Sequence, residues 1–261
     1  MNFLLVSAAS LVAMVLVYTA TFLIGRRIGR YNVVDVTWGA SFVVVAAVAA
    51  GVGTGDLLRR VLFLALVAVW GLRLAWHMVG KSKGKGEDPR YDNLLKGDFS
   101  PARVLKKIFL TQALTAWFIS LPLQLSATLG PTPTLLWPVL GLGVLVWVIG
   151  IAFEAVGDHQ LRVFKADPAH KGIIMDRGLW AWTRHPNYFG DACVWWGLWL
   201  VSIAGWVSLT TVLSPVAMTY FLVYATGARL TEKMMSGRPG FDEYCSRTSF
   251  FVPKPPRSSI T

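Results

Sequence analysis

Residues 178–203 read GLWAWTRHPNYFGDACVWWGLWLVSI, a polar run that opens directly into an apolar one. The proline after the histidine is typical of a helix's first residue, where its missing N–H is harmless. Arg184 and His185 then lie at a helix entrance, where the dipole and free N–H groups attract anions. Asn187 and Asp191 share one face of that helix. The stretch predicts a basic, hydrogen-bonding cup at a membrane surface that suits a charged cofactor, although a helix cap with a membrane anchor would explain each residue singly.

The composition extends the membrane interpretation to the whole chain. Its 261 residues are 54% hydrophobic, the mean hydropathy is positive, and apolar stretches of about 20 residues recur along it. We therefore expect an all-α, polytopic integral membrane protein with about seven transmembrane helices. The expected spans are 3–24, 33–52, 61–79, 108–128, 135–156, 188–204 and 207–227. The two cysteines and four scattered histidines predict neither a disulfide framework nor a metal site.

The net charge of +11 indicates orientation rather than a nucleic-acid partner. Of the 25 Lys and Arg residues, only Arg59, Arg60 and Arg73 lie outside the C-terminal tail and the loops after spans one, three and five. Because basic residues collect on the cytoplasmic side, we expect an outer N-terminus and a cytoplasmic C-terminus. We expect a multi-pass protein, of a bacterial inner membrane, whose site faces the cytoplasm. Its expected partners are membrane lipids and a lipophilic small molecule, and the oligomeric state stays open.

A charged stripe continues from the fifth span. Glu154, Asp158, Arg162 and Lys165 lie within about 80° of one another at about 100° per residue. A solvated ladder of ion pairs would explain the stripe, but a carboxylate near the end of a span is costly without a partner. We expect the carboxylates to bind ribose or amide groups and the basic residues to bind phosphates.

Polar groups also mark the early spans. Asp35 opens the second span, and Arg73 lies about two turns inside the third, so Arg73 should face a cavity or an acidic partner such as Asp35. The loop at 81–91, KSKGKGEDPRY, fits a ligand lid and a solvated loop equally well. In the tail, Phe241, Tyr244 and later phenylalanines add apolar weight, so we expect it to fold back over the cytoplasmic face.

Several of these pieces resemble the DUF1295 family, which belongs with the membrane steroid 5α-reductase-like proteins. They are 35–38 (DVTW), 84–91 (GKGEDPRY), 178–191 and 243–249 (EYCSRTS). The resemblance implies one seven-helix domain over 1–261, with substrate-side helices in 1–128 and a cofactor-binding half in 129–261. It implies an NADPH pocket open to the cytoplasm. Together with the residue pattern, it gives the expected cofactor-binding residues Glu154, Asp158, Arg162, Lys165, Trp182, Arg184, His185, Asn187, Tyr188, Asp191, Glu232, Tyr244 and Arg247.

The chain departs from the steroid enzymes at their catalytic tyrosine. If Arg73 holds the arginine position of their early helix, Trp70 stands where that tyrosine should be. We therefore expect Tyr91, Asp35 and Arg73 as the catalytic residues, with the proton donor left open. The resulting hypothesis is an NADPH-dependent reductase of an activated carbon–carbon double bond in a lipophilic substrate.

Two alternatives stay open. The run 184–188 (RHPNY), followed by Glu232, also resembles isoprenylcysteine carboxyl methyltransferases and phospholipid methyltransferases. That resemblance implies S-adenosylmethionine as the cofactor instead of NADPH. The third possibility is a non-catalytic lipid-binding membrane protein.

Overall fold

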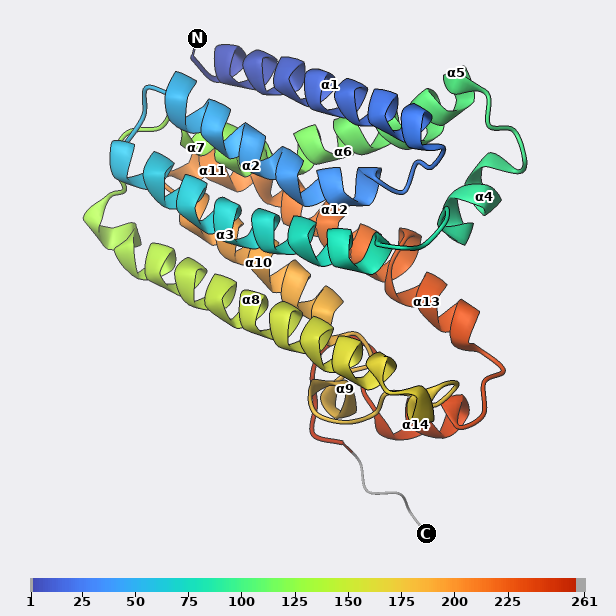
Figure 1. Ribbon diagram of the computed structural model, residues 1–261. Helices are drawn as coiled ribbons and strands as arrows, with labels where there is room; N and C mark the ends of the chain where they lie inside the picture. The colour runs from blue at the N-terminus through green and yellow to red at the C-terminus, as the bar shows by residue number, and fades with distance from the viewer. Residues whose placement is uncertain (1, 257–261) are drawn as a thin grey trace. The chain divides into compact units, whose positions relative to one another are not determined.

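The structure, a computed structural model, describes residues 2–256 and is built from helices (Figure 1). Within that range no strand forms, and only an isolated bridge joins Thr183 to Ser249. Contacts divide the chain into two compact units. The N-terminal unit comprises Met1–Trp137 with Ser202–Ser214, and the C-terminal unit comprises Pro138–Val201 with Pro215–Thr261. The all-α prediction is confirmed, whereas the division at 128/129 into substrate-side and cofactor-binding halves stays a prediction.

Three long helices lie side by side in the N-terminal unit (Figure 1). They are α1 (Asn2–Ile28), α2 (Val34–Val52) and α3 (Leu57–Ser82). Shorter elements complete the unit: α4 (Pro89–Leu95), α5 (Pro101–Val104), the π-helix η1 (Leu105–Leu110), α6 (Thr111–Ile119), α7 (Leu121–Ser126), η2 (Thr134–Leu136), α11 (Trp206–Leu209) and η4 (Thr210–Val212). The 80–107 segment, expected as a loop, is thus partly helical, because Asp88 caps α4 and Pro89 starts it.

Glycines set the distance between α2 and α3. A Cβ atom on Gly39 would lie 2.6 Å from the carbonyl oxygen of Gly71, and one on Gly71 would lie 2.5 Å from that of Gly39. Small residues let helix backbones approach where lipid provides no hydrophobic drive for association. A hydrogen bond of 2.8 Å between the hydroxyls of Thr21 and Thr37 adds a polar link from α1 to α2.

The C-terminal unit is organised around α8 (Trp137–Ala166) and α10 (Pro186–Ser202). Its other elements are η3 (Pro168–His170), α9 (Leu179–Trp182), most of α12 (Leu213–Tyr220), η5 (Phe221–Ala225), α13 (Ala228–Met235) and α14 (Phe241–Arg247). A Cβ on Gly150 of α8 would lie 2.6 Å from the carbonyl oxygen of Gly190 on α10. A Cβ on Gly197 would lie 2.7 Å from that of Gly143. The two backbones therefore touch at glycines along both helices.

Five helical stretches in residues 2–256 are long and apolar enough to cross a membrane, by length and composition. They are Asn2–Ile28, Val34–Val52, Leu57–Ser82, Thr134–Ala166 and Trp206–Met235. The expected span 108–128 is instead divided among η1, α6 and α7. Ser120 is not helical and lies two residues before Pro122. Proline lacks the backbone N–H that a continuous helix would use there. Most of the expected span 188–204 lies in α10, whose 17 residues end at Ser202. A multi-pass membrane protein is compatible with these helices, and the count of seven and the orientation stay predictions.

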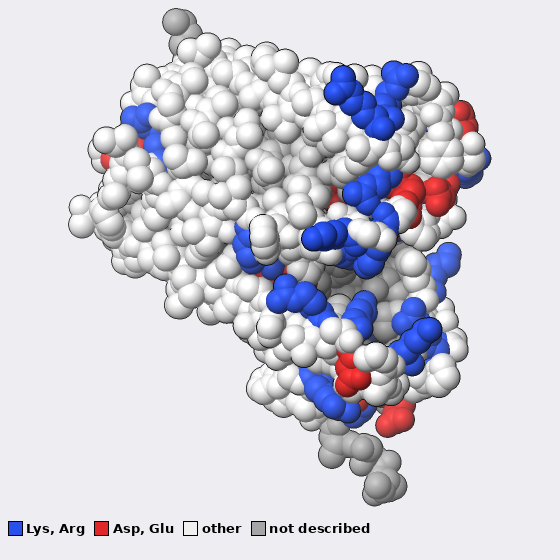
Figure 2. All heavy atoms as spheres, in the orientation of Figure 1, with Lys and Arg blue, Asp and Glu red and all other residues white. Residues whose placement is uncertain are grey.

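Most charged groups of the N-terminal unit lie near the helix ends, and Arg73, inside α3, is an exception. Figure 2 shows the surface over α1, α2 and α3 largely without Lys, Arg, Asp or Glu except near those ends. Arg59, one of the few basic residues outside the predicted cytoplasmic loops, is 1% exposed. Its Nη2 donates to the carbonyl oxygens of Leu129 at 2.9 Å and Gly130 at 2.6 Å. Arg59 therefore donates hydrogen bonds to carbonyl oxygens of the turn that follows α7. These bonds compensate for the cost of burying its charge.

The glycine contacts yield a test with a control on the same helix. Gly150→Ala should lower the melting temperature, because the new Cβ would overlap α10 at a cost of about 1–3 kcal/mol. Gly141→Ala places its Cβ where nothing lies within 4 Å. The control should be neutral or raise stability by up to about 1 kcal/mol, since alanine favours helix over glycine. Thermal unfolding of the detergent-solubilised chain measures both, and equal effects would contradict the packing argument.

Candidate cofactor-binding site

The entrance of α10 is held against α8 by the segment that precedes it. Gly178 adopts a φ of +59°, and a Cβ there would lie 2.5 Å from the side-chain amide of Gln160. The Oε1 of Gln160 accepts from the N–H of Leu179 at 3.0 Å. The indole of Trp180 donates to the carbonyl of Gly157 at 3.0 Å. Only glycine fits at 178, so this residue lets the polar stretch turn tightly on α8.

The C-terminal tail folds back onto the same segment, and that this face is cytoplasmic stays a prediction. The hydroxyl of Tyr244 on α14 donates to the carbonyl of Trp180 at 2.7 Å. The hydroxyl of the buried Thr183 donates to the carbonyl of Phe251 at 2.8 Å. Burial raises the pKa of the Tyr244 phenol, which therefore stays a neutral donor. Tyr244, expected to bind cofactor, thus uses its hydroxyl to fasten the tail.

Arg184 joins three parts of the C-terminal unit. Its Nε donates to Oε1 of Glu232 on α13 at 2.6 Å. Its Nη1 donates to the carbonyl oxygens of Cys245 at 3.0 Å and Thr248 at 2.8 Å. The Nε2 of His185, a residue 3% exposed, lies 3.2 Å from the same Oε1 of Glu232. Three predicted site residues, Arg184, His185 and Glu232, therefore meet at one carboxylate.

An open hollow of about 370 Å³ lies beside this cluster and is lined by Arg184, Arg229, Glu232 and Phe250. Its size is that of a small-molecule site. The guanidinium of Arg229 lies 5.9 Å from the ring centre of Phe250 and 4.8 Å from that of Tyr224. Arg229 and Phe250 were not among the expected site residues. A usable signal existed for Arg229, because it precedes Glu232 by three residues and so shares its helical face.

The charged stripe on α8 divides between buried and exposed groups. Asp158 is 7% exposed, and its Oδ1 accepts from Nδ2 of Asn187 at 3.1 Å, which brings two more expected site residues together. Arg162 is exposed and contacts Nδ1 of His159 at 3.0 Å. Lys165 is exposed as well. The acidic half of the stripe thus belongs to the helix contact, and the basic half faces outward.

The remaining expected residues lie beside the cluster of Arg184, His185 and Glu232 or in the contact between α8 and α10. Glu154 and Asp191 are buried on α8 and α10. The ring of Tyr188 stacks on that of His185, with centres 5.7 Å apart. Trp182 is exposed, and its carbonyl accepts from the N–H of Lys254.

Arg247 has a structural role in the tail. Its guanidinium forms an ion pair with Asp176, in the loop before α9. Beside it, Tyr244 packs with Ile174 and Phe241 in a small hydrophobic cluster. Arg247 therefore holds the tail to the 174–180 segment, in the same way as Tyr244.

The expected catalytic residues lie in the N-terminal unit. The hydroxyl of Tyr91 donates to Oδ1 of Asp35 at 2.6 Å, and Nη2 of Arg90 donates to Oδ2 at 2.8 Å. Asp35 therefore contacts Arg90 and Tyr91, and the expected pairing of Asp35 with Arg73 on α3 stays a prediction. The α4 cap brings Arg90 and Tyr91 back to the start of α2, which sequence spacing could not reveal. Burial and the Asp35 charge raise the pKa of Tyr91, so its phenol remains protonated.

Comparison with known proteins assigns the family. A family profile described as "Protein of unknown function (DUF1295)" matches residues 21–248. The chain belongs to the DUF1295 family. Membership in its steroid 5α-reductase-like branch stays a prediction for this DUF1295 protein.

A curated relative and the solved structures complete the comparison. The DUF1295 protein is 27% identical over 121 residues to a protein of Ustilaginoidea virens named "Probable O-methyltransferase ustE". The match covers 46% of this chain and 38% of that relative, so it spans well under two thirds of the relative's length. No solved structure matches.

The tail contacts of the DUF1295 protein can be tested by removing a single hydroxyl group. Tyr244→Phe removes the bond to Trp180 and leaves a buried carbonyl unsatisfied, which should cost about 1–3 kcal/mol. Amide hydrogen exchange should therefore become faster across 241–251. Tyr220→Phe is the control, because Tyr220 is 56% exposed. Unchanged exchange in Tyr244→Phe would show that the hydroxyl does not hold the tail.

Proposed function

We propose that this protein is a membrane enzyme that transfers a methyl group from S-adenosylmethionine to an oxygen atom of a lipophilic acceptor. The observation that carries the proposal is the meeting of Arg184, His185 and Glu232 beside the 370 Å³ hollow. These residues belong to the pieces of sequence that resemble the isoprenylcysteine carboxyl and phospholipid methyltransferases. They are far apart in the chain, and the fold brings them to one carboxylate.

The charges around the hollow favour a methyl donor over a dinucleotide. Arg184 is paired with Glu232 at 2.6 Å, so Arg229 supplies the remaining guanidinium of the lining. NADPH carries three phosphate groups, and one such guanidinium beside a carboxylate is a weak match for them. S-adenosylmethionine is a smaller ligand with a sulfonium and an amino-acid group, and its net charge is positive.

Each lining residue has a role toward such a ligand. Glu232 and the ring of Phe250 can face the sulfonium, by charge attraction and by cation–π contact. Arg229 can bind the amino-acid carboxylate through its planar fork. Arg184 and His185 fix the position of the Glu232 carboxylate. When bound, the cofactor supplies an electrophilic methyl group, and these residues orient it.

The curated relative supports the same class of reaction. Its printed name is that of a probable O-methyltransferase, and it shares 27% identity over 121 residues. We infer that the acceptor is lipophilic because five helical stretches within residues 2–256 are apolar and of membrane-spanning length. The expected site residues at the hollow are accordingly proposed as cofactor-binding residues for S-adenosylmethionine.

A second candidate is the NADPH-dependent reductase of an activated carbon–carbon double bond. One observation favours it: Asp158 and Asn187, both matched by residue type in the 5α-reductases, are hydrogen-bonded at 3.1 Å. Arg162 and Lys165 on the exposed part of α8 would then bind phosphates. Tyr91, Asp35 and Arg73 remain the proposed catalytic residues of that reaction.

Binding titrations separate the candidates. We expect S-adenosylmethionine and S-adenosylhomocysteine to stabilise the purified chain against heat, and NADPH and NADH to leave it unchanged. Stabilisation by NADPH alone would replace the first candidate by the second. No effect of any of the four would point to a non-catalytic lipid-binding protein.

Substitutions in the lining test where the ligand binds. Arg229→Gln should weaken S-adenosylmethionine binding about ten- to a hundredfold, because a charge-assisted hydrogen bond is worth about 1.5–3 kcal/mol. Arg229 is exposed, so this variant should fold normally. Glu243→Gln changes an exposed carboxylate on α14 and is the control. Equal affinities of Arg229→Gln and the unsubstituted chain would remove the hollow from consideration. Isothermal titration calorimetry measures each affinity.

A further inference from the structure

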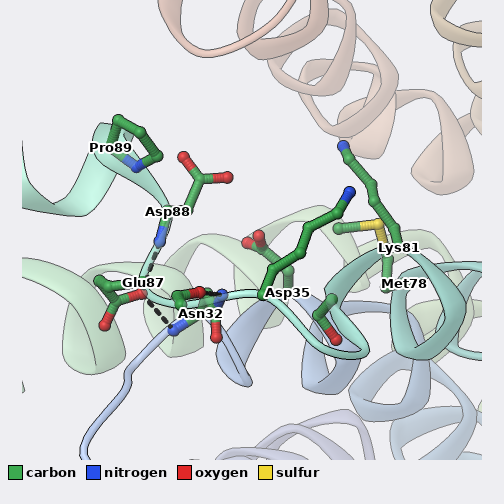
Figure 3. A pocket seen from close by; sticks show the side chains of 10 residues that line it. Asn32, Asp35, Met78, Lys81, Glu87, Asp88 and Pro89 are labelled. Carbon is green, nitrogen blue, oxygen red and sulfur yellow. Dashed lines mark hydrogen bonds between the residues drawn. The ribbon is translucent and has the colours of Figure 1, made fainter.

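A second hollow, of about 140 Å³, lies within the N-terminal unit where α2 begins and α3 ends (Figure 3). Its lining is polar and of mixed charge: Asn32, Asp35, Lys81, Lys85, Glu87 and Asp88 take part. In Figure 3, Lys81 and Asp88 lie on opposite sides of the hollow, and Glu87 is joined to Asn32 by a hydrogen bond. The proposed cofactor site uses none of these residues.

The carboxylates of the lining already have partners that fix them. Glu87 accepts from the backbone N–H groups of Asn32 at 2.9 Å and Asp88 at 3.0 Å. Asp88 and Asp35 each form an ion pair with Arg90, at 2.9 Å and 2.8 Å. These contacts hold the acidic side of the hollow, which is built by Asp35 of α2 and by the loop that connects α3 to α4.

Three residues of the lining, Asn32, Lys81 and Lys85, carry polar groups with spare binding capacity. Within residues 2–256, no carboxylate lies within ion-pair distance of Lys81 or Lys85. Asn32 is 6% exposed, and its Oδ1 is buried without a hydrogen-bond partner. Its Nδ2 donates to the carbonyl of Gly86 at 2.9 Å, which fixes the amide. A buried acceptor of this kind costs about 1–3 kcal/mol unless a donor reaches it.

We propose that this hollow binds a phosphoethanolamine group, with the phosphate at Lys81 and Lys85 and the ammonium at the Oδ1 of Asn32. The lining has two cations, Lys81 and Lys85, and three carboxylates, Asp35, Glu87 and Asp88. Arg90 lies outside the lining but forms ion pairs with Asp35 and Asp88, so the charges around the hollow sum to zero and are dipolar. A neutral, dipolar group matches such an arrangement, whereas an anion alone or a cation alone would meet repulsion on one side.

The position of the hollow indicates that the group belongs to a membrane lipid. It lies at the ends of two helices that are long and apolar enough to span a membrane. Lipid headgroups occupy that level, and polar pockets between membrane helices bind them. Free phosphoethanolamine shares the same chemistry, so the experiment includes both sources.

Native mass spectrometry of the full chain in detergent tests the proposal with three lipids of equal chain length. Phosphatidylethanolamine should be retained about tenfold better than phosphatidylcholine, whose methylated nitrogen cannot donate to Asn32. Phosphatidylethanolamine should also be retained better than phosphatidylglycerol, which has no ammonium group. Free phosphoethanolamine at millimolar concentration should compete with the lipid. If free phosphoethanolamine binds as tightly as the lipid, the hollow is still a phosphoethanolamine site, but its ligand is soluble.

Matched variants locate the site. Lys81→Gln with Lys85→Gln should abolish the preference for phosphatidylethanolamine. Lys83→Gln should keep it, because Lys83 lies in the same loop but does not line the hollow. Melting temperatures without lipid establish that the variants fold. The proposal would be overturned if Lys83→Gln lost the preference for phosphatidylethanolamine equally. Tighter binding of phosphatidylglycerol than of phosphatidylethanolamine would also overturn it.

Discussion

The C-terminal unit depends on how the charge of Arg184 is satisfied. A guanidinium at the entrance of an apolar helix is costly unless its donors are bound. Here they meet Glu232 at 2.6 Å and two tail carbonyls at 2.8 and 3.0 Å. These bonds join the segment just before α10 to α13, to α14 and to Thr248, the residue that follows α14. The hollow lies beside the same contacts, so one interaction both closes this part of the fold and positions the proposed ligand groups.

Close helix packing gives these charges a fixed frame. Glycines bring α8 and α10 into backbone contact, and Gly157 places the start of α10 beside α8, with Pro186 Cγ 3.2 Å from the position of a Cβ. In lipid, packing of small residues replaces the hydrophobic drive that holds soluble cores together. Because α8 carries Asp158 and α10 carries Asn187, the glycine register also decides that these two side chains meet at 3.1 Å. Packing and polar chemistry are thus set by the same helix crossing.

The sequence predicted part of the site and missed part of it for physical reasons. Arg184 and His185 stood out because polar groups at the mouth of an apolar run are conspicuous. Glu232 stood out in the same way after the last apolar run, although it lies 48 residues beyond Arg184. Phe250 did not, because an aromatic residue in a tail has no local feature that distinguishes packing from ligand contact. Asp35 was noticed as an anomaly, but its contacts with Arg90 and Tyr91 are supplied by a turn that the pattern did not reveal.

The sequence by itself determined the all-helical class, the places of the long apolar helices and the polar mouth of α10. These properties follow from local hydropathy and from residues such as Pro186, which act on their own neighbours. Only the tertiary structure decided which charges meet, that Tyr244 and Arg247 fasten the tail, and that Asn32 keeps a buried acceptor beside two lysines. Such contacts join residues far apart in the chain, and their geometry is set by helix packing rather than by any local pattern.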